Sequence, residues 1–395
     1  MIKKLTLLLL MAVLLPLLPG TPPVKAAPEL AVTESTATAS FPSAITFSMS
    51  AESSAAIADV RLHYYVERLS NARVTAEIYL DITPAAEITA EWTWDMRKTG
   101  GLPPGTAVRY WWTVKDTAGR DIRTETATLV FNDDRFQWQS VQQDTVTLYW
   151  YKGSNAFAGA LLDAAVEGIE TLYDTTGILF TDPVAIYIYS DSNALQNAMI
   201  FPQEWTGGVA YAQYATIAIG IQEGNLDWGL RTVVHELTHL VIHRMTDNPY
   251  LELPTWLDEG LAMYMEGPLT GSFNYYLNRA VANEALLTVR SLVSPFSADA
   301  TVSYLSYGES YCIVEMLIQR YDREKILDLL EKIRAGTDYD EALKQVYGFD
   351  MDELNSLFMT YMEETGERLS RTETEPDTLR VCEGILVPAC AGGMS

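Results

Sequence analysis

Cysteine is scarce in this sequence, with three residues among 395. A disulfide framework therefore cannot hold the body of the protein together, and its cores must be stabilised by burial of apolar side chains. Cys312 lies in an apolar stretch with helical spacing, which favours a buried free thiol. Cys382 and Cys390 could pair across a short loop near the carboxyl terminus, and the spacing alone leaves that pairing open.

Basic residues are also few. Lysines and arginines number 27 against 52 aspartates and glutamates, which gives a formal net charge of −25. Nucleic-acid-binding domains need a basic surface, so we expect no nucleic-acid partner. The acidic balance indicates either a preference for cationic substrates or simply a solvated acidic surface. The length of the chain is typical of two or three domains.

An apolar run that could enter a membrane is found at the amino terminus. Lys3 and Lys4 precede a nearly continuous apolar run over residues 5–18, and Val24-Lys25-Ala26 has the small-x-small pattern of a cleavage site. We therefore interpret residues 1–26 as a signal peptide and the protein as secreted. Because the run is short for a membrane span, an uncleaved membrane anchor is the less favoured alternative.

Histidine is limited to four residues, and two of them share one motif. His235-Glu236-Leu237-Thr238-His239 reads H-E-x-x-H within an apolar helical stretch. Residues four apart lie on one helix face, so His235 and His239 can present two imidazole nitrogens to one zinc ion. Glu236 is placed to act as general base on a water at that ion. The alternative is a structural helix with two partly buried histidines paired to carboxylates.

The third ligand of a catalytic zinc site is expected from the next helix. Glu259 lies 20 positions after His239, on a helix that begins near Pro254. Helices joined by a short loop pack antiparallel, which would bring Glu259 over the two histidines. A glutamate among apolar side chains is costly to bury without a partner, and a metal ion is a suitable partner. Asp258 could hydrogen-bond a ligand histidine from outside the ligand shell, or simply face solvent.

These motifs resemble those of a known group of enzymes. H-E-L-T-H followed by W-L-D-E-G-L-A is similar to the gluzincin zinc metallopeptidases, and more narrowly to the peptidase MA-like family. The resemblance covers about residues 135–365 and implies a Zn²⁺ cofactor held by His235, His239 and Glu259, with Glu236 as base. The other zinc pattern, H-E-x-x-H-x-x-G-x-x-H, does not fit, because Ile242 and Met245 occupy its glycine and third histidine.

The region before this unit has a different pattern. Short runs that alternate apolar and polar residues recur between turn signals over residues 28–131. Such runs predict an antiparallel β-sandwich, and the last hairpin resembles a fibronectin type III or immunoglobulin-like module. The domain could bind a surface or a partner, or could space and shield the rest of the chain. The alternating runs cover residues 45–49, 60–66, 74–80, 88–94, 108–114 and 125–131.

Residues 135–366 predict an α+β domain with a mainly helical second half, and residues 367–395 a polar tail. We expect strands at 141–151, 184–189, 207–211 and 216–221, and helices at 157–173, 273–287, 304–321, 323–335, 339–346 and 351–364.

The strand before the zinc helix is a candidate for substrate binding. In gluzincins this strand forms the edge of the sheet beside the metal, and an extended peptide can pair with such an edge. We therefore assign substrate binding to Gly207, Gly208 and Ala210; a plain hairpin glycine pair is the equal alternative. Aminopeptidase-type relatives carry a glutamate in this strand that grips the substrate's amino terminus. The segment Gly208–Ala212 has no acidic residue, which favours an endopeptidase.

The resemblance also implies a tyrosine that stabilises the oxyanion of the tetrahedral intermediate. Tyr307, expected at the start of a helix, matches the family's position, and Tyr304 and Tyr311 are rivals.

The sequence thus predicts a secreted two-domain zinc peptidase acting on peptide or protein substrates, with an open oligomeric state. The rivals are a catalytically idle extracellular binding scaffold and a zinc hydrolase of a non-peptide amide.

Overall fold

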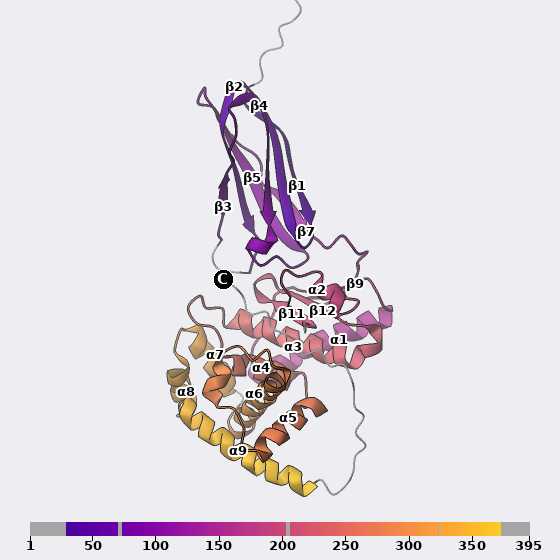
Figure 1. Cartoon of the computed structure of the whole chain (residues 1–395), viewed down its shortest axis with the longest axis vertical. Coiled ribbons are helices and arrows are strands. Elements are labelled where there is room, and N and C mark those ends of the chain that lie inside the picture. The colour runs from indigo at the N-terminus through magenta and orange to yellow at the C-terminus, as the bar shows by residue number, and fades with distance from the viewer. Residues whose placement is uncertain (1–28, 70–72, 203–205, 323, 373–395) are drawn as a thin grey trace, which may run out of the picture.

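The computed structural model describes residues 29–372 except 70–72, 203–205 and 323 (Figure 1). The predicted signal peptide and the possible Cys382–Cys390 pair lie outside these residues. Cys312 is buried and free, as predicted. In the described part of the chain, no helix has the length and apolar character needed to cross a membrane.

The first part of the chain is rich in strands that share one hydrogen-bonded network (Figure 1). The long strand β2 organises it: its first half pairs with β1 and β4, and its second half pairs with β3 and β5. A short helical turn, η1 (Met96–Lys98), follows β4. The strands are β1 (Ala31–Ser40), β2 (Ala44–Val66), β3 (Ala76–Tyr79), β4 (Ala85–Asp95), β5 (Thr106–Asp116), β6 (Asp121–Arg123) and β7 (Ala127–Phe131).

Strand β2 corrects one expectation from the sequence. The runs 45–49 and 60–66 belong to a single 23-residue strand instead of two strands. The segment between them has no glycine or proline to end a strand, and the pairing register shifts between Glu52 and Ile57, where a bulge can bend the strand. The predicted sandwich stays a prediction, since the strands are joined into one sheet through β2.

The core of this region follows from the alternation of its strands. Phe47 on the first half of β2 and Tyr110 on β5 are both buried, and their ring centroids lie 5.2 Å apart. Trp112 is fully buried in the same cluster. The two halves of β2 therefore serve one hydrophobic core.

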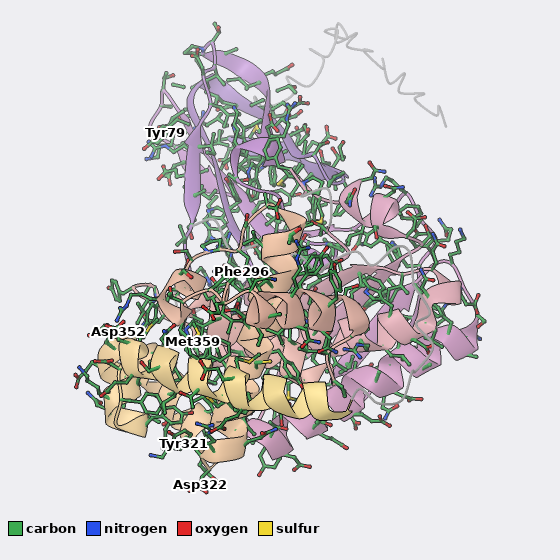
Figure 2. The ribbon with its side chains drawn as sticks, turned by 60° about the horizontal axis from the view of Figure 1, so that its bottom comes forward. Tyr79, Phe296, Tyr321, Asp322, Asp352 and Met359 are labelled. Carbon is green, nitrogen blue, oxygen red and sulfur yellow. The ribbon has the colours of Figure 1, made fainter. Side chains whose placement is uncertain are left out.

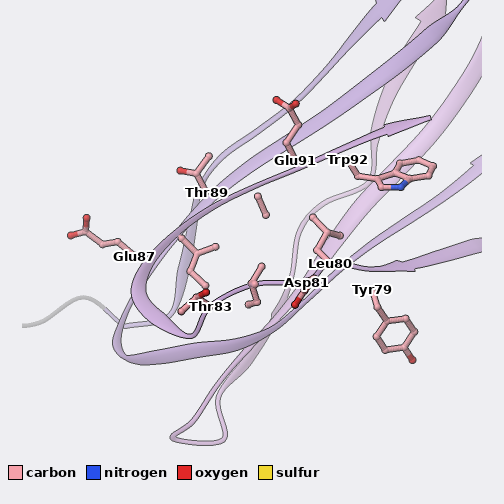
Figure 3. A pocket seen from close by; sticks show the side chains of 11 residues that line it. Tyr79, Leu80, Asp81, Thr83, Glu87, Thr89, Glu91 and Trp92 are labelled. Carbon is pink, nitrogen blue, oxygen red and sulfur yellow. The ribbon is translucent and has the colours of Figure 1, made fainter. Parts of the chain in front are cut away.

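An open hollow of about 450 Å³ lies where β3 ends and β4 begins (Figure 3). Tyr79 and Trp92 contribute aromatic surface, and the carboxylates of Asp81, Glu87 and Glu91 stand along it. Charged side chains at a strand edge discourage pairing with other chains, which accounts for the acidic rim.

The second part begins with a five-stranded sheet in the order β11-β12-β10-β9-β8. Strands β9, β10 and β12 are parallel, and β11 is an antiparallel edge strand. The segment expected as one strand, 141–151, is a hairpin that turns at Asp144, whose φ is 51°. The strands are β8 (Gln139–Gln143), β9 (Val146–Trp150), β10 (Val184–Tyr189), β11 (Gly208–Tyr211) and β12 (Thr216–Gly220).

Helices form most of the remainder, as predicted. Figure 2 shows α9, in yellow, crossing the helical half. The helix expected to run to 287 ends at Ala282, because Glu284 adopts a φ of 52°. The helices are α1 (Asn155–Thr176), α2 (Ser192–Gln196), α3 (Leu226–Met245), α4 (Thr255–Met265), α5 (Gly271–Ala282), α6 (Ala300–Arg320), α7 (Glu324–Arg334), α8 (Tyr339–Tyr347) and α9 (Met351–Thr372), with short turns η2 (Ala212–Tyr214), η3 (Glu223–Asn225) and η4 (Val289–Val293).

Helices α4 and α6 approach each other closely at Gly260. A Cβ atom on Gly260 would lie 2.4 Å from the main-chain oxygen of Ser310 and 2.7 Å from Val314 Cγ2. This contact fixes the spacing of α4 and α6. Glu259 lies on α4 and Tyr307 on α6, so the same contact sets the distance between these two candidate residues.

We predict that Gly260→Ala lowers the free energy of unfolding by about 1–3 kcal/mol, because the methyl group must push two helix backbones apart. Urea unfolding followed by circular dichroism measures it. Gly159→Ala in α1 is the matched control: no atom lies within 4 Å of its Cβ position, so it should stabilise the protein by about 0.4–1 kcal/mol. Equal effects of the two substitutions would contradict the packing argument.

Candidate metal centre

Helices α3 and α4 bring three candidate ligands together. His235 and His239 lie one turn apart on α3 and are almost fully buried, and their Nε2 atoms are 3.1 Å apart. Glu259 on α4 is 4% exposed. Its Oε2 lies 3.6 Å from His235 Nε2 and 3.4 Å from His239 Nε2. The predicted convergence of two imidazoles and one carboxylate is therefore present in the fold.

The chemistry of this donor set fits zinc. Two imidazole nitrogens and one carboxylate oxygen form the three-ligand set of a catalytic site that keeps a fourth position open. The Oε2 atom of Glu259 is buried and has no hydrogen-bond partner among the described residues. A buried carboxylate oxygen in that state is costly unless a cation compensates it. Burial alone would raise the pKa of Glu259, but the adjacent His239 and His235 outweigh it and hold the pKa well below its usual range.

Glu236 faces the same space from the neighbouring position on α3. It is fully buried, and both of its carboxylate oxygens lack hydrogen-bond partners in the described part of the chain. Burial raises its pKa to about 7, against the opposing charges of His235 and His239. A carboxyl group with this pKa can accept and release a proton near neutral pH. This is the property required of the predicted base.

Asp258 connects two histidines of α3. His239 Nδ1 donates to Asp258 Oδ1 at 2.8 Å, and His243 Nε2 lies 2.7 Å from Asp258 Oδ2. With the proton on Nδ1, His239 keeps the lone pair of Nε2 free for a metal. The orientation role suggested for Asp258 therefore has the geometry it needs. His243 joins the arrangement from one turn further along α3.

A second carboxylate of this kind was missed in the sequence. Glu266 Oε2 lies 3.5 Å from His235 Nδ1, and its Oε1 lies 3.3 Å from Arg231 Nη2. Arg231 also donates to the main-chain oxygen of Pro268 at 2.8 Å. The signal was present: Glu266 follows Glu259 by seven residues, which is two turns on the same helix face. Each candidate ligand histidine thus has a carboxylate beside its Nδ1.

Tyr307 reaches the centre from α6. Its hydroxyl donates to Glu259 Oε1 at 3.4 Å, and its ring packs edge-on against Phe296, which is labelled in Figure 2. The expectation that Tyr307 opens a helix is wrong: α6 begins at Ala300, where the Asp299 side chain caps it. Of the rivals, Tyr304 stacks on Tyr276 and Tyr311 donates to Glu315.

The candidate substrate residues lie on the edge strand β11. The carbonyl of Gly207 already accepts from Gly220 N–H at 2.9 Å, so Gly207 is paired inward. In an antiparallel ladder the alternate residues, Gly208 and Ala210, then turn their main-chain groups to the outer edge. In the described residues no strand pairs with that edge. A Cβ on Gly208 would lie 2.5 Å from Glu236 Oε1, so only glycine fits beside Glu236.

We predict that Glu266→Gln weakens zinc binding about 10–100-fold, because the charge that orients His235 is lost. Competition with a chromophoric zinc chelator at fixed pH measures the affinity. Glu170→Gln, at an exposed position on α1, is the control and should leave the affinity unchanged. Unaltered affinity in Glu266→Gln would show that the 3.5 Å contact does not act on the metal.

No curated protein matches the chain. Among solved structures, a mutant M1 zinc metallopeptidase from Deinococcus radiodurans is 11% identical and covers 84% of this chain and 94% of its own, with a TM-score of 0.35. A carbohydrate-binding module of family 56, a β-1,3-glucan-binding domain, is 18% identical over 26% of this chain and 99% of its own, with a TM-score of 0.16.

OgpA from Akkermansia muciniphila is 12% identical, with a TM-score of 0.21, over 29% of this chain and 31% of its own; this chain therefore spans under a third of OgpA. At such TM-scores these structures add nothing to the assignment. The family model of the Peptidase MA superfamily matches residues 164–364, just over half of the chain, and includes α3, α4 and α6. The chain therefore belongs to the Peptidase MA superfamily.

Proposed function

We propose that the chain is a zinc-dependent peptidase that hydrolyses peptide bonds with Glu236 as general base. The observation that carries the proposal is the convergence of His235, His239 and Glu259 on one buried point, with the Glu236 carboxylate beside it. A zinc ion held there would act as a Lewis acid on the peptide carbonyl and would lower the pKa of a water molecule to about 7.

Glu236 carries the proton through the reaction. Its carboxylate accepts a proton from the attacking water as the new C–O bond forms. It then gives that proton to the peptide nitrogen as the C–N bond breaks, so the amine leaves neutral. The raised pKa, about 7, suits both halves of this transfer. A single group thus serves as base and then as acid.

Tyr307 is proposed as the donor to the oxyanion. Its hydroxyl is buried and already touches the candidate ligand Glu259 at 3.4 Å. A donor held in place before the reaction stabilises charge that develops only in the transition state. Asp258 and Glu266 act earlier, by holding His239 and His235 in orientation.

The substrate is proposed to be a peptide or protein segment bound in extended form along β11. Gly208 and Ala210 supply main-chain donors and acceptors at the outer edge. No acidic residue lies between Gly208 and Ala212 to grip a free amino terminus, which supports an endopeptidase over an aminopeptidase. We also propose that the protein is secreted and that residues 28–131 and 135–366 form two domains. The first of these domains would bind a surface or a partner.

We predict that Glu236→Gln retains about one zinc per chain, because the three ligands are intact. Its rate of casein hydrolysis should fall about 10²–10⁴-fold, because proton transfer is lost. Metal analysis and a casein assay measure the two properties. Glu331→Gln, exposed on α7, should behave like the parent. Undiminished hydrolysis by Glu236→Gln would refute the mechanism, and a metal-free parent would favour a binding scaffold.

We predict that Tyr307→Phe lowers kcat about 10²–10³-fold with little change in KM, because a transition-state donor is removed while the aromatic packing stays. Steady-state kinetics on one peptide separates the two constants. Tyr304→Phe is the matched control on the same helix. A rise in KM alone would assign Tyr307 to substrate binding, and an equal loss in Tyr304→Phe would argue for a packing effect.

A further inference from the structure

The outer edge of β11 is short and has two distinct ends. The strand covers four residues, Gly208–Tyr211, which is about 13 Å at the usual rise per residue. Its first residue lies beside Glu236. Its last residue leads into the turn η2, Ala212–Tyr214. What lies at η2 therefore decides how far a bound peptide can continue in that direction.

Main-chain groups from the first region of the protein occupy that end. Leu69 N–H donates to the main-chain oxygen of Gln213 at 2.8 Å. The carbonyl of Leu69 accepts from Arg244 Nη1 at 2.6 Å. Arg68 donates to Gln213 Oε1 at 3.2 Å, and its guanidinium lies 5.4 Å from the centre of the Tyr214 ring. The peptide of Leu69 is thus held from both sides, by η2 and by the end of α3.

This contact involves the same helix that carries His235 and His239. Arg244 follows His239 by five residues on α3, which is about 7.5 Å along the helix axis. Arg244 is itself held by Asp182, at 2.9 Å from Nε to Oδ2. The outer edge of β11 therefore runs from Glu236 toward η2, where Arg68 and Leu69 are hydrogen-bonded to Gln213.

The first region and the unit that contains β11 also contact each other away from Leu69. Tyr214 and Ile200, from the second unit, pack against the hydrophobic core of the first region. Gly105 approaches the Tyr187 hydroxyl so closely that a Cβ would lie 2.4 Å from it. Figure 1 shows the strands of the first region standing directly on the unit that contains β11 and α3. The two parts thus meet over several contacts besides the one at Leu69.

We infer that Arg68 and Leu69 form the end wall of the substrate groove, so that the first region limits how many residues a substrate has on one side of the cleaved bond. A peptide paired with β11 advances about 3.3 Å per residue and meets Leu69 after roughly four residues. The inference rests on the proposed peptidase function and specifies its substrate class. The favoured substrates are short on that side.

The test uses two nested sets of quenched fluorogenic peptides built on one cleavage site mapped in casein. One set grows residue by residue at the amino end, and the other at the carboxyl end. For the zinc-loaded parent, kcat/KM should fall about tenfold once roughly four residues are exceeded on one side, and should change less than about twofold on the other.

Two substitutions loosen the wall without touching the candidate ligands. Leu69→Pro removes the N–H that Gln213 accepts, and Arg244→Gln removes the donor to the Leu69 carbonyl. Each should reduce the length-dependent fall to less than about threefold. Arg290→Gln, whose guanidinium pairs with Asp340 and Asp352, is the control and should keep the parent's profile. Zinc content and thermal unfolding establish that each variant is folded and loaded.

The outcomes are distinguishable. Cleavage by the parent with equal tolerance of length at both ends would overturn the end wall and leave the peptidase function standing. A parent profile retained in both folded variants would also overturn it. Failure of the zinc-loaded parent to cleave any peptide or casein would refute the peptidase function, and the inference with it.

Discussion

Burial of two carboxylates in one apolar helix pair is the constraint on which the site depends. Glu236 and Glu259 are at most 4% exposed, and the surrounding Leu240, Trp256 and Leu261 offer no compensating charge. An isolated ionised carboxylate in such a place costs several kcal/mol or more. The two neighbouring imidazoles relieve part of that cost. A divalent cation bound there would relieve the rest, and its binding free energy would then add to the stability of the fold.

The same constraint explains how charge is arranged further out. Asp258 and Glu266 lie behind the two candidate ligand histidines, and each contacts a further side chain, His243 at 2.7 Å and Arg231 at 3.3 Å. The hydrogen bond from Nδ1 to Asp258 fixes the tautomer of His239 and makes its Nε2 a better metal ligand, while Glu266 places negative charge 3.5 Å from His235 Nδ1. Because Asp258 also contacts His243 and Glu266 also contacts Arg231, neither carboxylate is left without a second partner beside its ligand histidine.

Much of the site could be predicted from the sequence because its spacing is local. The residues of H-E-x-x-H share one helix face, and a short loop returns α4 antiparallel to α3, so His235, His239 and Glu259 needed only helix geometry. Glu266 obeyed the same rule and was overlooked. The unbroken β2 was missed because alternating runs separated by small polar residues look the same whether the strand continues or turns.

Other features lie beyond any local pattern. The contact of Tyr307 with Glu259 depends on how closely α4 and α6 pack, and that spacing is set by Gly260, 47 residues earlier in the chain. A glycine within a helix pattern does not reveal which backbone it lets approach. Packing between helices that are distant in the sequence therefore decides that Tyr307, and not Tyr304 or Tyr311, contacts Glu259.

The continuity of β2 links the two parts of the molecule. A turn in the middle of this strand would have placed its end elsewhere. Because the strand is continuous, the residues that follow it, Glu67–Leu69, lie beside η2 and the end of α3. Pairing holds that delivery in register up to the junction, since Glu67 N–H still donates to Ala107 O at 2.9 Å. Leu69 makes its contacts with η2 and α3 through its main chain alone. No side-chain pattern in the sequence could therefore predict these contacts. The length and registry of one strand therefore fix where the main chain of Leu69 meets η2 and the end of α3.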